Sequence, residues 1–518
     1  MKSLPTRPVA GQQFDYAFDD IGNRKQTKSG GDQSGANLRP ANYTNNLLNQ
    51  ITSRDVPGYV DILGAGIATN SVTVNGQTAY RKGEYFRKEL SADNTSAALW
   101  TNIIVAAAGQ TSVTGNVFVA KTPETFGYDA DGNLTNDGRW TLTWDAENRL
   151  TKVESLATGP TASKRKVVWE FDGKGRRIRQ ATSDGSSGSY VVTEDLKFVS
   201  DGWRHIAELN ATNNALVRSY VWGLDLSGSL DGAGGVGGLL MANSAANGVH
   251  FYAYDGNGNV AALVKASDGT VSANYEYEAF GQTIRATGTM AKENPFRFST
   301  KRTDNTTDFV LYEMRIYIPS LARWGSRDPI GERGGANIYG FVRNDSCNHW
   351  DVDGRFSYSI HHFITFWAAY EAGYSDKCAK KIARAAANTD IWHAFDHPYH
   401  FTRPVWGDPE TYRQQAERNR DDLRNEAEQH ALNGQCHRAL KDLGRSLHVQ
   451  EDYYSHVIDG KPAAWDPSGN YERDGVVDHP NHRDNVDDHD YARAEVARQA
   501  VMGTLSSLLR SFSCCCSK

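Results

Sequence analysis

Aromatic and other apolar residues alternate with polar residues in short runs over the first 350 or so residues of the chain. Several runs share the order aromatic-x-aromatic-Asp-x-x-Gly/Asn-Asn/Arg. They are Phe14–Lys25, Phe126–Thr135, Leu142–Val153, Trp169–Ile178 and Tyr252–Leu263. A period of two places the large side chains on one face of a strand, and the Gly or Asn accepts the positive φ of a tight turn. The pattern predicts strand–turn–strand units that repeat into a long antiparallel sheet.

From Ile360 onward the apolar period changes to 3.6 residues, which indicates helices. Helices are predicted over residues 361–372, 375–388, 411–433, 436–455 and 487–511. Gly373, Gly434 and proline-bearing stretches separate these runs. The last third of the chain is therefore expected to form an all-α domain of about five helices.

Composition changes at the same place. Only eight of the 48 glycines follow Arg355, whereas 12 of the 15 histidines do. A chain of 518 residues also exceeds what one core usually supports, so two or more domains are expected. The net charge of −6 provides no general attraction for nucleic acid or an anionic membrane. No stretch reaches the roughly 20 apolar residues of a transmembrane helix, and no secretory signal peptide is recognisable, so export would need a delivery system.

The repeated runs resemble the YD repeats of Rhs proteins, and Asn294–Gly354 resembles the Rhs-associated core. This resemblance implies a multidomain protein with an all-β YD-repeat shell over residues 1–293, the C-terminal part of a hollow cocoon. The core follows over 294–355, and an α-helical toxin domain over 356–518. Such toxins imply a secretion machinery, type VI secretion among them, and a cognate immunity protein as partners.

The family's core also resembles an aspartyl autoprotease, in which two Asp-Pro-x-Gly elements bring two carboxylates together to activate water. Asp328 begins an intact element, Asp328–Gly331, and Asp351 begins the altered element Asp351–Gly354. Val352 stands where proline is usual and Asp353 where an apolar residue is usual. The resemblance implies cleavage just after Gly354. The alternative is that both aspartates only stabilise turns.

The isolated cysteines Cys347, Cys378 and Cys436 are expected to be small buried apolar residues. Six cysteines in a chain of this length do not indicate a disulfide framework. The terminal triplet Cys514–Cys516 has no assigned role.

The segment Cys436–Val457 carries the strongest metal-ligand spacing. His448 continues an apolar helical face, Asp452 follows one turn later, and His456 one turn after that. Imidazole and carboxylate on one stripe suit a zinc site. The alternative is a surface pair or a buried histidine bonded to a backbone carbonyl.

The order of these groups resembles the zinc-dependent phospholipase C and single-strand nuclease superfamily. The resemblance implies two or three Zn²⁺ ions. Asp390 would be the bridging ligand and would orient or deprotonate the attacking water. The implied metal ligands are His361 or His362, Asp390, His400 or else His397, His448, Asp452, His456, and His479 or His482. Part of that superfamily uses a free N-terminal amine as a ligand, so cleavage near Arg355 would also complete the metal site.

The resulting prediction is an exported toxin with a zinc-dependent phosphodiester hydrolase domain. A phospholipase C acting on phospholipid is favoured, and a nuclease of the same fold, acting on nucleic acid, is the alternative. A non-enzymatic surface or adhesion protein is the alternative of another class. A catalytic Asp390 with an open coordination position would argue against it, and a closed, fully ligated site would support it.

Overall fold

The computed structural model describes residues 8–226, 230, 233–334, 337–355, 365, 368–370, 372–392, 402–404, 408–458, 461–465, 471–473, 476–478, 499–508 and 512. For some of these, including 390, 452 and 456, only the backbone is described. The chain divides into two compact units, Met1–Phe356 and Ser357–Lys518. The core segment expected over 294–355 therefore packs within the first unit.

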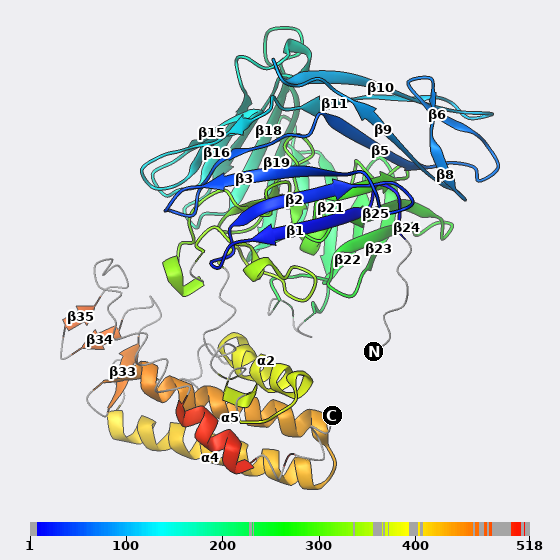
Figure 1. Cartoon of the computed structure of the whole chain (residues 1–518). Coiled ribbons are helices and arrows are strands. Elements are labelled where there is room, and N and C mark those ends of the chain that lie inside the picture. The colour runs from blue at the N-terminus through cyan, green and yellow to red at the C-terminus, as the bar shows by residue number, and fades with distance from the viewer. Residues whose placement is uncertain are drawn as a thin grey trace. The chain divides into compact units, whose positions relative to one another are not determined.

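The first unit contains a 14-stranded antiparallel sheet in which the strands follow one another in chain order, from β13 to β26 (Figure 1). Its strands are β13 Gly127–Tyr128, β14 Leu134–Asn136, β15 Trp140–Trp144, β16 Leu150–Ser155, β17 Arg165–Phe171, β18 Arg177–Asp184, β19 Val191–Asp201, β20 Arg204–Asn210, β21 Leu216–Trp222, β22 Leu239–Ser244, β23 Gly248–Tyr254, β24 Val260–Lys265, β25 Val271–Tyr277 and β26 Thr283–Thr287. The long antiparallel sheet predicted from the repeats is confirmed.

Smaller antiparallel sheets complete this unit. One has the order β1–β2–β3–β4–β12, a second β11–β10–β6–β7, a third β5–β9–β8 and a fourth β27–β28–β29–β30. Their strands are β1 Gln13–Phe18, β2 Arg24–Gly30, β3 Leu38–Asn45, β4 Ile51–Arg54, β5 Tyr59–Ala65, β6 Val72–Val74, β7 Gln77–Thr78, β8 Tyr80–Lys82, β9 Tyr85–Ser91, β10 Leu99–Ala107, β11 Val113–Val119, β12 Glu124–Thr125, β27 Arg302–Thr303, β28 Val310–Leu311, β29 Ile316–Ile318 and β30 Arg323–Trp324.

Each repeat turn is held by its own aspartate. Asp172 shows the pattern: its Oδ1 accepts hydrogen bonds from the backbone N–H groups of Lys174 (2.9 Å) and Arg176 (3.0 Å). Gly175 adopts a φ of +79° in this turn. The aspartates of the other repeats, Asp19, Asp129, Asp145 and Asp255, accept the same bond from the residue four positions on. These short-range bonds confirm the predicted tight turns.

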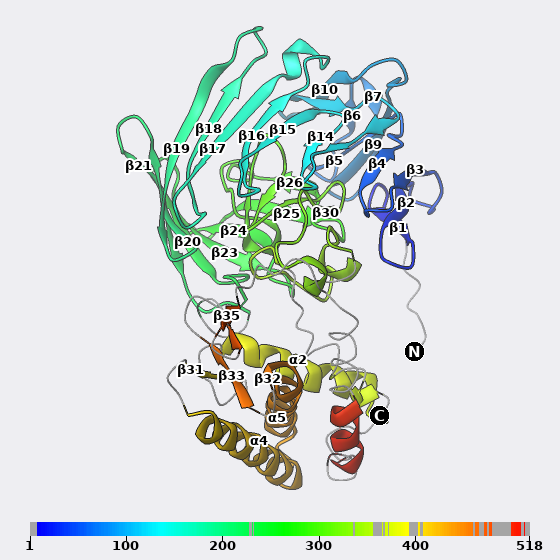
Figure 2. The same ribbon diagram turned by 90° about the vertical axis from the view of Figure 1, so that its left-hand side faces the viewer.

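The core segment packs against the long sheet, and Figure 2 shows the region of β30 on the concave side of that curved sheet. Buried Trp140, Leu142 and Trp169 of the sheet share one apolar cluster with Phe309 and Ile316 of the core segment. An ion pair joins the same two parts, because buried Arg302 contacts Glu208, which has no exposed surface. The core segment is thereby attached to the sheet by both apolar and charged contacts.

The second unit contains three labelled helices, α2 Asp376–Trp392, α4 Pro409–Leu432 and α5 Cys436–His456, and residues 499–508 are also helical. Helix α4 begins two residues before the predicted start, because the Asp408 side chain accepts a hydrogen bond from Thr411 N–H and Pro409 fits the first helical position. Gly444 of α5 approaches α2 so closely that a Cβ there would lie 2.4 Å from the Ile382 carbonyl oxygen. Helices α2 and α5 therefore cross with almost no space between their backbones.

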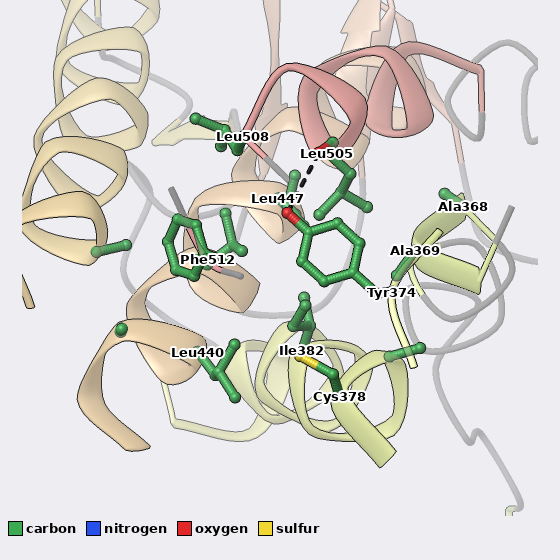
Figure 3. Close-up of a cluster of buried hydrophobic side chains, with 14 of the residues drawn as sticks. Ala368, Ala369, Tyr374, Cys378, Ile382, Leu440, Leu447, Leu505, Leu508 and Phe512 are labelled. Atoms are coloured by element: carbon green, nitrogen blue, oxygen red, sulfur yellow. Dashed lines mark hydrogen bonds between the residues drawn. The ribbon is translucent and has the colours of Figure 1, made fainter. Parts of the chain in front are cut away.

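The apolar core of this unit lies between these helices (Figure 3). The Tyr374 ring lies among Ile382, Leu447 and Leu505, and its hydroxyl donates a hydrogen bond to the Leu505 carbonyl oxygen at 3.2 Å. Helical segment 499–508 is joined to the other helices by this contact.

The all-α expectation for this unit is wrong in one respect. A small sheet has the order β31–β33–β34–β35, with β32 paired to β33. Its strands are β31 Thr402–Pro404, β32 Val457–Ile458, β33 Lys461–Trp465, β34 Tyr471–Arg473 and β35 Val476–Asp478. These short stretches contain β-branched and aromatic residues, which favour strands. They escape a search for period 3.6 because each is only two to five residues long.

Candidate active site

Asp328 lies in a turn that follows strand β30. Its Oδ1 accepts a hydrogen bond from Ile330 N–H at 3.0 Å, and its carbonyl oxygen accepts one from Gly331 N–H at 2.9 Å. The turn-forming role considered for this residue is therefore real. The turn uses only the Oδ1 atom of the carboxylate. The other oxygen, Oδ2, lies 2.7 Å from Nη2 of Arg315.

Asp351 is arranged in the same way. Its Oδ1 accepts hydrogen bonds from the N–H groups of Asp353 (3.1 Å) and Gly354 (2.8 Å). Its Oδ2 lies 3.9 Å from Arg315 Nη2 and has no hydrogen-bond partner among the described residues. The residue is 2% exposed, so this oxygen is buried. A buried carboxylate oxygen without a hydrogen bond is costly for a structural group, and it suits a catalytic one.

Arg315 joins the two turns, although 23 residues separate their aspartates. Its guanidinium carbon lies 4.2 Å from the centroid of the Trp324 ring, and its side chain is 1% exposed. Nη2 contacts both carboxylates, and Nε donates a hydrogen bond to the carbonyl oxygen of Gly354. Sequence reasoning missed this residue. The signal was an arginine among the large apolar residues of the segment Met314–Ile318.

The two carboxyl groups differ electrostatically. The pKa of Asp351 is raised to about 7, mainly by burial, with Arg315 opposing the shift and Asp353 adding to it. Burial also raises the pKa of Asp328, again opposed by Arg315. Since the guanidinium lies closer to Asp328, we assign the charged form to Asp328 and the proton to Asp351 below pH 7. One base and one acid then face the same site.

Gly354 follows Asp351 in a conformation that favours glycine, with a φ of +90°. A Cβ at this position would lie 3.1 Å from both the Arg315 nitrogen and the Tyr312 Cβ. The small residue lets the chain approach Arg315, which polarises the Gly354 carbonyl group. An acid, a base and a polarised carbonyl group are the groups that hydrolysis of a peptide bond by two carboxyl groups requires.

The predicted ligands of the helical unit are described only in part. His361, His362, His397, His400, His479 and His482 lie outside the described residues. Asp390 lies in α2, and Asp452 and His456 lie in α5, but their side chains are not described. Among the side chains that the structure does describe, no three His, Cys, Asp or Glu residues form a group that could hold a metal ion.

His448 is the predicted ligand whose side chain is described. It has no exposed surface and follows Leu440, Leu443 and Leu447 of the apolar cluster. The backbone of α5 runs unbroken from Cys436 to His456, so positions 448, 452 and 456 lie one turn apart on one helical face. The stripe predicted from the sequence therefore exists as a backbone arrangement.

The interpretation of the cysteines as small buried residues needs correction. Cys378 and Cys436 are both disulfide-bonded. Cys378 is nevertheless buried, whereas Cys347 is a free and exposed cysteine. Cysteine counting missed the disulfides because pairing depends on the distance between Cβ atoms and not on sequence spacing.

Among helices in the described part of the chain, none is long and apolar enough to cross a membrane. No family model matches the chain. It is 29% identical over 271 residues to the tRNA(Glu)-specific nuclease WapA of Bacillus subtilis subsp. natto, a match that covers 51% of this chain and 10% of that protein. It is 28% identical over 266 residues to the double-stranded DNA deaminase toxin A of Burkholderia cenocepacia, covering 47% of this chain and 18% of that protein.

The chain is also similar to one in the crystal structure of TcdB2-TccC3. This match has 17% identity and a TM-score of 0.35, and it covers 66% of this chain and 17% of the TcdB2-TccC3 chain. The chain spans only between a tenth and a fifth of the length of the two curated relatives. These matches do not identify the helical unit. Over about half of its length, the chain is similar to proteins that are named as toxins or nucleases.

Proposed function

We propose that the first unit is an aspartyl autoprotease that cuts the chain after Gly354 and so separates the helical unit, a toxin domain, from the β-rich shell. The observation that carries this proposal is the position of Arg315. One buried guanidinium contacts Asp328, Asp351 and the carbonyl oxygen of Gly354. Two turn aspartates with no common task would not need to share one buried arginine.

The reaction follows from these contacts. Asp328 accepts a proton from a water molecule, and the water oxygen forms a bond to the Gly354 carbonyl carbon. Asp351 donates its proton to the carbonyl oxygen while Arg315 stabilises the charge that develops there. Asp328 then passes the proton that it took from water to the Arg355 nitrogen, the C–N bond breaks, and a hydroxyl proton of the intermediate returns to Asp351. The products are the Gly354 carboxylate and the α-ammonium group of Arg355.

The test is cleavage of the full chain synthesised in a cell-free system. We expect two fragments, with Arg355 as the new N-terminus of the smaller one. Asp351→Asn and Asp328→Asn should both leave the chain intact. Asp255→Asn is the matched control, because Asp255 holds a repeat turn through the same type of backbone bonds. An intact wild-type chain, or cleavage by Asp351→Asn, would refute the proposal.

For the helical unit, we propose a zinc-dependent phosphodiester hydrolase, with phospholipid as the favoured substrate. Support comes from the order of its histidines and aspartates and from the unbroken helix that carries positions 448, 452 and 456. Residues 448, 452, 456 and Asp390 would contribute to holding the ions. Bound zinc would supply an acidified water and stabilise charge on the phosphate.

A nuclease is the second candidate, because the order of the histidines and aspartates resembles single-strand nucleases as well as phospholipases C. Metal content and hydrolysis of phosphatidylcholine vesicles, single-stranded DNA and tRNA by the released fragment distinguish the candidates. Asp452→Ala is the site variant, and Asp421→Ala, on the exposed surface of α4, is the control. Lipid turnover lost only in Asp452→Ala supports the phospholipase. Turnover of DNA or tRNA alone supports the nuclease. Bound metal without turnover of any substrate favours the non-enzymatic surface or adhesion protein.

A further inference from the structure

Lys301 is a buried cation that the proposed reaction does not use directly. Its side chain is 5% exposed. Nζ donates hydrogen bonds to Glu313 (2.8 Å to Oε1 and 3.0 Å to Oε2), to the Gly234 carbonyl oxygen (2.9 Å) and to the Val352 carbonyl oxygen (2.7 Å). An ammonium group has three N–H donors, so these three partners use all of them. Such a complete set of contacts fixes the group in one place.

Val352 lies between Asp351 and Asp353, and its carbonyl is the first of three in a row that are held. Lys301 binds the Val352 oxygen, Met314 N–H donates to the Asp353 oxygen at 2.9 Å, and Arg315 Nε donates to the Gly354 oxygen. Glu313, which pairs with Lys301, directly precedes Met314 and Arg315. Residues 313–315 therefore restrain the carbonyl groups of residues 352–354 in the same order. Glu313 does so indirectly, because it pairs with Lys301, which binds the Val352 oxygen.

The other side of the Val352 carbonyl is closed by backbone. Gly234 lies in the loop between β21 and β22, and a Cβ there would lie 2.0 Å from the Val352 oxygen. The loop itself is held by Asp225, whose Oδ2 accepts hydrogen bonds from the N–H groups of Ala233 (2.7 Å) and Gly235 (3.1 Å). The Val352 carbonyl thus has a fixed neighbour on one side and a charged donor on the other.

We propose that Lys301 is a positioning residue for self-cleavage. It anchors the peptide that follows Asp351, so that the Asp351 carboxyl group and the Gly354 carbonyl group both reach Arg315. This inference rests on the proposed cleavage after Gly354. The role of Lys301 also explains how the Asp351–Gly354 turn could work with Val352 in place of proline. A proline ring would restrain the φ of residue 352, and here the hydrogen bond from Lys301 restrains the peptide instead.

The test follows cleavage of the full chain over time after synthesis, for Lys301→Met, Lys301→Arg and Gly234→Ala. Misplacing a reacting group by about 1 Å can cost on the order of 10²-fold in rate, so Lys301→Met should cleave at least about tenfold more slowly per folded molecule. Lys301→Arg should recover part of the rate, because Arg also donates to a carbonyl. Lys265→Met, which removes an exposed ion pair with Asp268, is the control and should cleave normally.

The amount of folded chain is measured by the thermal unfolding transition, so that loss of fold is separated from loss of positioning. If Lys301→Met does not fold, Gly234→Ala decides, because a Cβ at position 234 would displace the Val352 carbonyl that Lys301 holds. Wild-type rates in the folded variants, with Asp351→Asn inactive, would overturn the role of Lys301 and leave the proposed protease standing. Cleavage by Asp351→Asn would overturn both.

Discussion

The pH dependence of self-cleavage is the sharpest prediction that the candidate site allows. Asp351 must carry a proton to act as the acid, and its pKa is about 7. At pH 6 about nine molecules in ten carry this proton, and at pH 8 about one in ten does. The rate should therefore fall roughly tenfold between pH 6 and pH 8, and roughly tenfold again for each further unit. An ordinary aspartate would place this fall near pH 4.

The assay uses the slow reaction at high pH to collect uncut chain. The chain is synthesised at pH 8.5, diluted into buffers between pH 5 and pH 8.5, and sampled over time for the two fragments. Asp353→Asn should move the fall to lower pH, because the charge of Asp353 raises the pKa of Asp351. A rate that is constant between pH 6 and pH 8.5, or one that rises over this range, would refute the assignment of the acid to Asp351.

Four further predictions concern the packing around the site and in the helical unit. Burial alone would raise the pKa of Glu208, but Arg302 and Arg218 outweigh it and lower that pKa to about 2. The carboxylate thus contributes about 3 kcal/mol of stability above pH 4.5, and this contribution is lost as the pH falls towards 2. The free energy of unfolding, measured with urea, should therefore fall less steeply with decreasing pH in Glu208→Gln than in the wild type. Arg315→Ala should abolish cleavage and lower stability by about 3–5 kcal/mol, because two buried carboxyl groups lose their shared cation; fragment analysis and urea unfolding check this. Reduction of the disulfide that includes Cys378 should destabilise the helical unit by about 2–5 kcal/mol in calorimetry, whereas an unchanged transition would contradict its structural role. Leu447 has no exposed surface, so Leu447→Ala should lower the free energy of unfolding of the helical unit by about 2–5 kcal/mol in calorimetry and leave cleavage unaffected.

Local bonds made the β-rich unit predictable from its sequence. In each repeat turn the aspartate binds N–H groups no more than four residues away, so the motif contains all the groups that form the turn. The same holds for α4, whose first turn is capped by Asp408 three residues before Thr411. Helices α2, α4 and α5 were placed by their apolar period, since burial of one face is itself a periodic constraint.

The candidate site was predictable only in its two aspartates. Asp328 and Asp351 were found because each begins an Asp-x-x-Gly element that resembles those of the Rhs-associated core. Arg315 was not, since its partners lie 13, 36 and 39 residues further along the chain and no local pattern records them. The strands of the helical unit and the disulfide bonding of Cys378 and Cys436 were not predicted either. Strand pairing and disulfide bonding also depend on contacts between residues that the sequence pattern does not record.

The sequence by itself determined the repeat turns, the sheet that they build, the helical change after residue 360 and the identity of two candidate carboxylates. Only the tertiary structure decided that these carboxylates share one buried guanidinium, and that Lys301 binds a carbonyl 51 residues away. The physical reason is the range of the interactions. Turns and helices are stabilised within a few residues, whereas the pKa of Asp351 and the position of Gly354 depend on charges that burial brings together from distant parts of the chain.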